Sequence, residues 1–237
     1  MPGLLLLPFS RDNRAAAVLR SADFGETWAL GAALPVDAAW TWVATGPPGG
    51  LQLASGRLVL PIDRSGGAAL PFASTAFLSD DLGATWRLSA GAVPGGNECQ
   101  AAALPWRSNA TVHLSARASD GRGTRLAAES TDGGATWSAP WRTVAETACE
   151  ASVLALPRSR RLVLASAFAA QRENMTLHVS DDDGRTFAPR VRVDAGPAAY
   201  SALADLSTAA GDAVGLLWEG GGAIYGDIVF ATIAVPQ

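Results

Sequence analysis

The sequence predicts an all-β fold of the β-propeller class, and three observations carry this prediction. An eight-residue pattern, S-x-D-x-G-x-T-[WF], occurs four times at nearly constant spacing. A short stretch of alternating apolar residues precedes each copy, as expected of half-buried strands. No segment shows the sustained apolar period of 3.6 residues that indicates an amphipathic helix. The length of 237 residues suits one all-β domain.

The repeated pattern, here called the box, predicts one tight turn in each structural repeat. Ser and Asp side chains bond nearby backbone amides, and Gly tolerates positive φ, so the aromatic residue can pack beneath the turn. We therefore interpret each box Asp as a structural residue. The first residues of the copies are separated by 58, 51 and 50 positions, a period typical of four-stranded propeller blades. The four copies are residues 21–28 (SADFGETW), 79–86 (SDDLGATW), 130–137 (STDGGATW) and 180–187 (SDDDGRTF).

The stretches before the boxes predict the strands that enter these turns. In chain order they read AAAVLRS, TAFLS, RLAAES and MTLHVS. After each box the chain becomes polar and then extends again, so the pattern indicates a β-hairpin repeated four times. The fourth box contains DDDG at residues 181–184, but it lacks the full ligand series and the closing Glu of a calcium loop.

The composition excludes two classes of partner. The net charge is −4, and no cluster of Lys and Arg is present to follow a phosphate backbone, so we expect no nucleic-acid binding. No apolar stretch approaches the ~20 residues that a membrane-spanning helix needs, so we expect no transmembrane segment.

Cysteine and histidine are too sparse to indicate a disulfide framework or a metal site. Cys99 and Cys149 are two cysteines in 237 residues, and we expect them at equivalent points of neighbouring inner strands without a disulfide. His113 and His178 have no metal-ligand spacing around them, so we expect no metal ion and no cofactor.

The box resembles the aspartic box of the sialidase (neuraminidase) family, whose six-bladed propellers carry it on the rim. The same box occurs in receptor, plant-cell-wall-degrading and photosystem-assembly propellers, so alone it does not indicate an activity. The segments between the boxes are more specific. GPPGGLQLASGRLVLP at residues 46–61 resembles the family's GPGxGIQLxxGRLVxP, and NECQ at residues 97–100 is a family motif. The resemblance extends from about residue 17 to the C-terminus.

Five residues match functional positions of that family. NECQ and the R-x-N-x-T-L run at residues 172–177 resemble the lysosomal-type animal branch in particular. The family's Glu of NECQ acts as a base, its Tyr in YSxL as a nucleophile, and its arginines as ligands of the substrate carboxylate. The resemblance therefore implies that the catalytic residues are Tyr200 and Glu98, and that the substrate-binding residues are Arg117, Arg172 and Glu219.

The chemistry of sialic acid explains why these residue types are needed. A carboxylate lies directly on the anomeric carbon, so an anionic nucleophile would approach against its charge, and sialidases use a Tyr instead. A phenol with a pKa near 10 is a weak nucleophile until a Glu within hydrogen-bonding reach accepts its proton. Guanidinium groups stay charged and meet a carboxylate through two parallel hydrogen bonds.

Each of these residues taken alone has an ordinary structural interpretation. Glu98 is compatible with a solvated carboxylate at a strand end, Tyr200 with a core or rim aromatic, and Arg117 and Arg172 with surface positions. The functional interpretation is favoured because all of them occur in family order between the boxes.

Two family features are absent from the sequence. The family's first arginine lies in a [YF]-R-I-P motif, and its acid/base Asp follows; neither motif is present, and Arg11, Asp12 and Arg14 lie in no matching context. Six blades of about 50 residues need more chain than 237 residues. We therefore expect residues 1–237 to form a single sialidase-like propeller domain that lacks the N-terminal blade or blades.

A further departure is Ile62-Asp63, where many relatives have an aromatic residue that lines the substrate pocket.

These observations lead to two hypotheses. The first is an exo-α-sialidase, a retaining glycoside hydrolase whose partners are sialylated glycoproteins, glycolipids or oligosaccharides. The alternative is a non-catalytic sialoside-binding or interaction propeller that has lost the first arginine and the Asp acid/base. The glycosylation sequons at Asn109 and Asn174 favour a secretory or lysosomal route.

Overall fold

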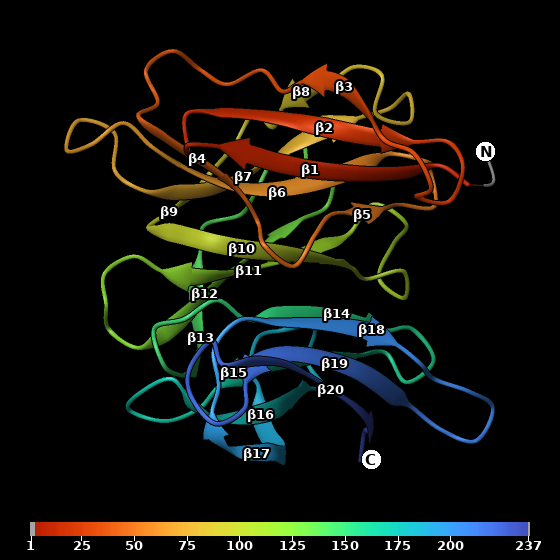
Figure 1. Ribbon diagram of the computed structural model, residues 1–237, viewed down its shortest axis with the longest axis vertical. Coiled ribbons are helices and arrows are strands. Elements are labelled where there is room, and N and C mark those ends of the chain that lie inside the picture. The colour runs from red at the N-terminus through yellow and green to blue at the C-terminus, as the bar shows by residue number, and fades with distance from the viewer. Residues whose placement is uncertain (1–2, 237) are drawn as a thin grey trace.

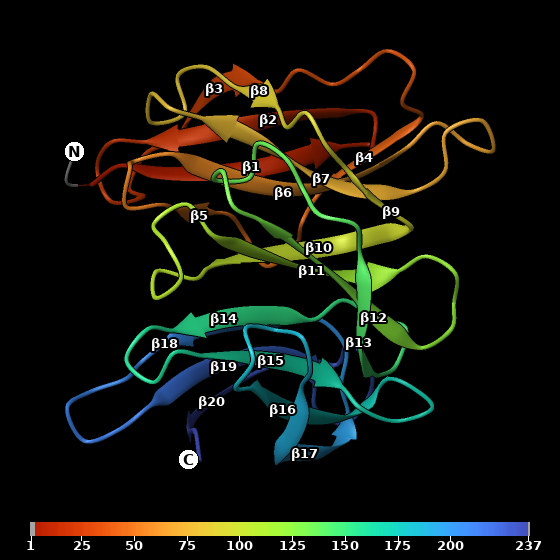
Figure 2. The same cartoon turned by 180° about the vertical axis from the view of Figure 1, so that it is seen from behind.

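The computed structural model describes residues 3–236 and confirms the all-β, propeller-type arrangement. Within that range, strands β1 to β20 form five antiparallel sheets that follow one another in chain order (Figure 1). Each sheet contacts the next: β1 contacts β4, β10 contacts β6 and β14, and β14 contacts β18. Figure 2 shows from behind the strands β13 and β17, which complete the third and fourth sheets.

The strands have the following bounds. The first sheet consists of β1 (Leu5–Arg11), β2 (Ala15–Ser21) and β3 (Ala29–Ala33). The second contains β4 (Trp42–Thr45), β5 (Leu51–Gln52), β6 (Leu58–Ser65), β7 (Ala73–Ser79), β8 (Arg87–Leu88) and β9 (Val93–Pro94). The third contains β10 (Gly96–Ala103), β11 (Val112–Ala118), β12 (Thr124–Ser130) and β13 (Trp141–Ala145). The fourth contains β14 (Ser152–Leu156), β15 (Arg161–Ala167), β16 (Glu173–Ser180) and β17 (Ala188–Pro197), and the fifth β18 (Ser201–Asp205), β19 (Ala213–Gly220) and β20 (Asp227–Ala234).

The four boxes form the turns that the sequence predicts, between β2 and β3, β7 and β8, β12 and β13, and β16 and β17. In the first box the amide of Gly25 donates to Ser21 Oγ at 2.8 Å, and the amide of Thr27 donates to Asp23 Oδ1 at 3.0 Å. The other three boxes repeat both hydrogen bonds. Because the side chains satisfy the amides of the turn, each box is held by its own sequence.

The core lies between neighbouring sheets, so the middle strands of the second, third and fourth sheets are largely buried on both faces. All residues of β7 and of β15 are buried. Between the fourth and fifth sheets, Met175 and Leu177 of β16 pack in one cluster with Val214 and Leu216 of β19. This burial on both faces explains why these strands read as nearly continuous apolar runs rather than as strict alternation.

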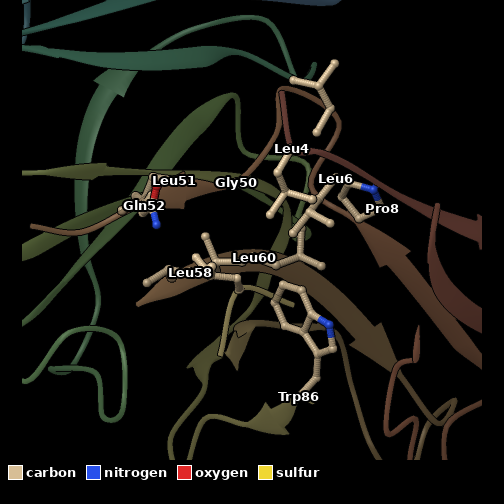
Figure 3. Close-up of a pocket in the computed structure, with 12 residues that line it drawn as sticks. Leu4, Leu6, Pro8, Gly50, Leu51, Gln52, Leu58, Leu60 and Trp86 are labelled. Atoms are coloured by element: carbon tan, nitrogen blue, oxygen red, sulfur yellow. The ribbon is translucent and has the colours of Figure 1, made fainter. Parts of the chain in front are cut away.

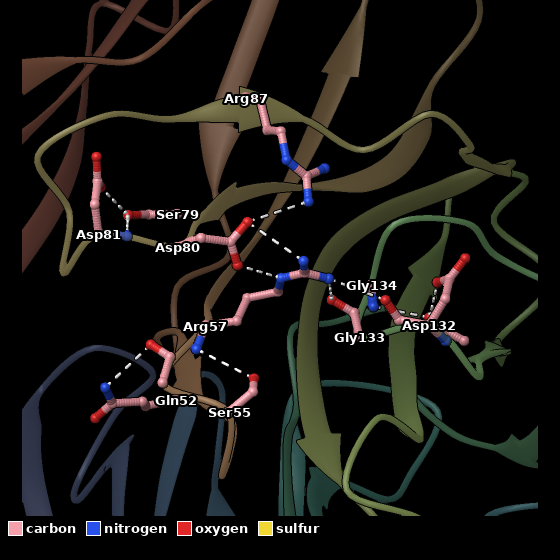
Figure 4. Close-up of polar contacts among 12 residues, drawn as sticks. Gln52, Ser55, Arg57, Ser79, Asp80, Asp81, Arg87, Asp132, Gly133 and Gly134 are labelled. Atoms are coloured by element: carbon pink, nitrogen blue, oxygen red, sulfur yellow. Dashed lines mark hydrogen bonds and ion pairs between the residues drawn. The ribbon is translucent and has the colours of Figure 1, made fainter.

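Arginine side chains also join neighbouring sheets at the boxes. Arg57, at the start of β6, donates to Asp80 Oδ1 of the second box at 2.6 Å and to the backbone carbonyl of Asp132 in the third box at 3.0 Å (Figure 4). Arg107 likewise contacts Asp183 of the fourth box at 2.7 Å. These contacts set the relative position of successive turns.

Residues 3–236 form five sheets, whereas the resembled family has six blades. The first and fifth sheets have three strands each, and both carry exposed apolar side chains. Leu5 and Leu7 of β1 are 42% and 50% exposed, and Ile228 and Phe230 of β20 are 69% and 61% exposed. An apolar hollow of about 260 Å³ lies between β1 and the β5–β6 region and is lined by Leu6, Leu51, Leu60 and Trp86, among others (Figure 3).

Candidate active site

Glu98 is the centre of the candidate site, because its two carboxylate oxygens bind two other site residues. The Tyr200 hydroxyl donates a hydrogen bond to Glu98 Oε1, and Arg117 Nη1 donates to Glu98 Oε2 at 2.9 Å. Glu98 lies in β10, Arg117 in β11, and Tyr200 immediately before β18. The structure thus brings together three of the residues that the sequence predicts, from the third and fifth sheets.

A β-bulge directs Glu98 toward its partners. The register of β10 against β11 shifts between Gly96 and Cys99, and Glu98 lies inside this irregularity. A bulge leaves a residue out of the regular ladder and can redirect its side chain, and bulges are frequent beside functional sites. The glycines before NECQ fit this geometry, since Gly95 has φ +77° and a Cβ on Gly96 would lie 2.3 Å from Ser74 Oγ.

Tyr200 is held at its backbone by Glu219 of β19. The amide of Tyr200 donates to Glu219 Oε2 at 3.2 Å, and the amide of Glu219 donates to the carbonyl of Tyr200 at 2.9 Å. The resemblance implies that Glu219 is a substrate-binding residue. In the structure, the carboxylate of Glu219 accepts a hydrogen bond from the backbone amide of Tyr200.

Arg172 lies beside two aromatic rings, those of Tyr200 and Tyr225. Its guanidinium carbon is 5.7 Å from the centre of the Tyr200 ring and 5.8 Å from that of Tyr225, and its Nη1 donates to the Tyr225 hydroxyl. Both distances are within the range of cation–π attraction. Tyr225, in the loop between β19 and β20, was assigned no role from the sequence; the signal that could have indicated it is its place in the segment EGGGAIY, six residues after Glu219.

Two hollows flank the Glu98–Tyr200 hydrogen bond. A cleft of about 320 Å³ is lined by Trp42, Phe72, Glu98 and Arg117, among others. Tyr200 lines a neighbouring hollow of about 240 Å³, together with the loop at residues 47–48 and with β19. Glu98 thus lines one hollow and Tyr200 the other, and the hydrogen bond between their side chains joins the two linings.

The surroundings of Tyr200 keep its phenol protonated in the resting state. Burial raises the pKa of Tyr200 above its ordinary value, and the hydrogen bond to Glu98 raises this pKa further. Both effects favour the neutral phenol, and its hydrogen-bond acceptor is the carboxylate of Glu98.

A second carboxyl group lies beneath the cleft and was not assigned from the sequence. Asp63 of β6 is fully buried, and the indole Nε1 of Trp42 donates to its Oδ2 at 2.8 Å. Burial raises the pKa of Asp63 to about 7, and the charge of Glu98 adds to this effect. The sequence signal is an Asp within the apolar strand segment LVLPID.

Further buried charges support the strands that carry the site. Arg125 and Glu146 form a buried ion pair at 2.7 Å. Glu150 is also buried, and its Oε2 accepts the amide of Ser201 at 2.8 Å, one residue after Tyr200. Burial raises the pKa of Glu150 to about 8, with the nearby Glu98 and Glu146 as smaller causes.

The two cysteines are buried and unpaired, Cys99 in β10 and Cys149 shortly before β14. Among residues 3–236, no group of three or more His, Cys, Asp or Glu side chains is arranged to hold a metal ion. The same residues contain no helix that is long and apolar enough to cross a membrane.

Residues 9–213 match the family model of the BNR repeat-like domain. This chain belongs to the BNR repeat-like domain family. Among curated proteins, human Sialidase-4 (Homo sapiens) is 33% identical over 177 residues, which are 66% of this chain and 36% of Sialidase-4. The chain therefore spans about a third of the length of that relative.

Solved structures similar to this BNR repeat-like chain include several sialidases. The Hadza microbial sialidase Hz136 superposes with a TM-score of 0.79 at 24% identity, over 93% of this chain and 44% of that one. The intramolecular trans-sialidase from Ruminococcus gnavus gives a TM-score of 0.71 at 20% identity, over 93% of this chain and 50% of that one. At these identities the likeness establishes the shared fold.

Proposed function

We propose that this chain carries the catalytic centre of an exo-α-sialidase, a retaining glycoside hydrolase that releases terminal sialic acid from glycoproteins, glycolipids or oligosaccharides. The observation that carries the proposal is the contact of Glu98 with both Tyr200 and Arg117. The likeness to human Sialidase-4 and to sialidase structures supports the class of reaction.

In the proposed first step, Arg117 and Arg172 bind the substrate carboxylate. Arg117 exchanges part of its contact with Glu98, and Arg172 its contact with Tyr225, for the oxygens of the ligand. The Tyr200 oxygen forms a bond to the anomeric carbon while the bond to the departing alcohol breaks. The phenol proton passes to Glu98, and the departing alcohol takes a proton from solvent.

In the second step, water attacks the same carbon and breaks its bond to Tyr200. Glu98 returns its proton to the tyrosyl oxygen, and the proton that water loses balances the one that the alcohol gained. Two displacements at one carbon retain the anomeric configuration. In the resembled family an Asp protonates the alcohol, and we assign this role to no residue of the chain.

The isolated chain is expected to be a slow enzyme, because general-acid assistance is worth about 10²–10⁴-fold. We would measure hydrolysis of 4-methylumbelliferyl sialic acid, whose leaving group needs little protonation, and follow the anomer released by NMR. With this substrate, turnover with retained configuration is expected for the chain, and none for Tyr200→Phe. Turnover by Tyr200→Phe equal to that of the wild type would overturn the mechanism.

One observation favours a second candidate, a sialoside-binding propeller without catalysis. The sequence contains Arg117, Arg172 and Tyr200 but neither the [YF]-R-I-P motif nor the Asp that follows it in the family. Binding of 3′-sialyllactose without turnover, lost in Arg117→Gln, would establish this candidate in place of the enzyme.

A further inference from the structure

The cleft beside Glu98 has an ionic side and an aromatic side. Glu98 and Arg117 line the ionic side, and Trp42 and Phe72 line the aromatic side. The rings of Trp42 and Phe72 meet edge to face, with 6.1 Å between their centres and an interplanar angle of 70°. Such a pairing restricts the rotation of both side chains.

Asp63 restricts Trp42 from beneath. The hydrogen bond from Trp42 Nε1 to Asp63 Oδ2 is 2.8 Å long and lies within the protein, since Asp63 is fully buried. The other oxygen, Asp63 Oδ1, is buried without a hydrogen-bond partner in the structure. A buried carboxyl with one oxygen unpaired is costly, so it is retained here at an energetic penalty while it orients one indole ring.

A comparison with a neighbouring tryptophan shows that the position of Trp42 is not that of a core residue. Trp40 is 9% exposed and packs in an apolar cluster with Phe77, whereas Trp42 is 37% exposed and presents its ring to the cleft. The aromatic side of the cleft is therefore supplied by Trp42 of β4 and by Phe72, which directly precedes β7.

We propose that Trp42, positioned by Asp63 and Phe72, is a specificity-determining wall of the cleft that binds the apolar C–H face of a sugar whose carboxylate Arg117 holds. This inference rests on the proposed function, because it assigns a contact to the same substrate. Aromatic rings bind apolar ligand faces through buried area and dispersion, and a polar edge of the ring can stay hydrogen-bonded. Asp63 acts through Trp42 and is a positioning residue.

The test is a binding titration of the full chain with 3′-sialyllactose, followed by NMR. Trp42→Leu is expected to weaken binding roughly three- to tenfold, the range of one aromatic contact. Trp28→Leu is the matched control, because Trp28 is 42% exposed in the first box, away from the cleft residues. Asp63→Leu is expected to weaken binding similarly, and Asp63→Asn, which keeps a hydrogen-bond acceptor for the indole, is expected to restore it.

A second measurement needs no substitution and so does not depend on the folding of variants. The indole N–H resonance of Trp42 in the wild-type chain is expected to shift as 3′-sialyllactose is added, while that of Trp28 stays constant. One outcome would contradict the role of Trp42 and leave the proposed function intact: Arg117→Gln abolishes binding, Trp42→Leu binds as tightly as the wild type, and the Trp42 resonance does not shift. If the wild type does not bind, or if Arg117→Gln binds as the wild type does, the proposed function fails and the wall fails with it.

Discussion

Glu98 accepts a hydrogen bond from the hydroxyl of Tyr200, a residue 102 positions further along the chain. Its other carboxylate oxygen accepts Arg117 Nη1 at 2.9 Å, so one side chain joins β10, β11 and the start of β18. Strand β14 of the fourth sheet lies between β10 and β18 and contacts both of them. The candidate site therefore depends on the relative position of three consecutive sheets.

The first prediction concerns the carboxylate itself. Glu98→Gln keeps the size of the side chain but cannot accept the phenol proton, so kcat for 4-methylumbelliferyl sialic acid is expected to fall about 10²–10⁴-fold. KM should change little. The matched control is Glu26→Gln, which changes an exposed carboxylate in the first box. Equal rates for Glu98→Gln and the wild type would show that Tyr200 needs no base from this position.

The second prediction concerns the hydroxyl that holds Arg172. Tyr225→Phe removes the acceptor of Arg172 Nη1 but keeps the ring beside the guanidinium. Arg172 exchanges this hydrogen bond for the substrate carboxylate on binding, and one such bond is worth about 0.5–1.5 kcal/mol, so KM is expected to fall about two- to tenfold while kcat stays near the wild-type value. A fall in kcat without a change in KM would instead give Tyr225 a role in the chemical step.

The third prediction is a pH dependence of stability that Glu150 causes. Its pKa in the folded chain is raised from 4.5 to about 8, so the folded state favours the protonated form. This contribution is fully present below pH 4.5 and is lost as the pH rises toward 8. In that pH window Glu150 is ionised in the unfolded chain but still protonated in the folded one. The free energy of unfolding should therefore fall by about 1.4 kcal/mol per pH unit.

Glu150→Gln removes that titration, since an amide can still accept the Ser201 amide without ionising. The difference in unfolding free energy between this variant and the wild type should grow in favour of the variant from pH 5 to pH 8, as measured by urea denaturation. A constant difference across that range would mean that Glu150 does not titrate with a raised pKa. Buried Asp63 and Glu146 have pKa values raised in the same direction and remain in both proteins.

The fourth prediction separates the two adjacent aspartates of the fourth box. Asp182 accepts hydrogen bonds from Ser180 Oγ at 2.8 Å and from the amide of Thr186 at 2.9 Å. Asp181 is exposed and approaches Arg190 at 3.6 Å. Asp182→Ala is expected to lower the unfolding free energy by about 1–3 kcal/mol, and Asp181→Ala by less than about 0.5 kcal/mol. Equal losses would show that charge, rather than the turn geometry, stabilises the box.

The parts of the fold that could be predicted from the sequence are those whose hydrogen bonds form within one short segment. The box contains its own hydrogen-bond donors and acceptors, so the turn at Ser21 and its three repeats follow from local chemistry. The contact of Glu98 with Tyr200 does not follow from spacing, because no local rule relates residues 102 positions apart. The resemblance to sialidases placed both residues in one site, and the structure brings them together.

Other contacts depended on side-chain packing between sheets, which sequence patterns do not encode. Arg172 turns toward Tyr225 instead of lining the cleft with Arg117. Glu219 accepts the amide of Tyr200, an arrangement that no motif indicated. The Asp63 hydrogen bond to Trp42 joins two strands of one sheet, and it became visible only with the register of β4 against β6.

The separation of Glu98 and Tyr200 along the chain also has a consequence for biosynthesis. A ribosome that adds about 5–20 residues per second makes Tyr200 roughly 5–20 s after Glu98. During that interval the carboxylate of Glu98 has no phenol to bind; the second sheet has already been synthesised, and the third is completed at Ala145, before Tyr200 is added. The site is therefore assembled late, and its hydrogen bond reports that the fifth sheet has docked on the nascent protein.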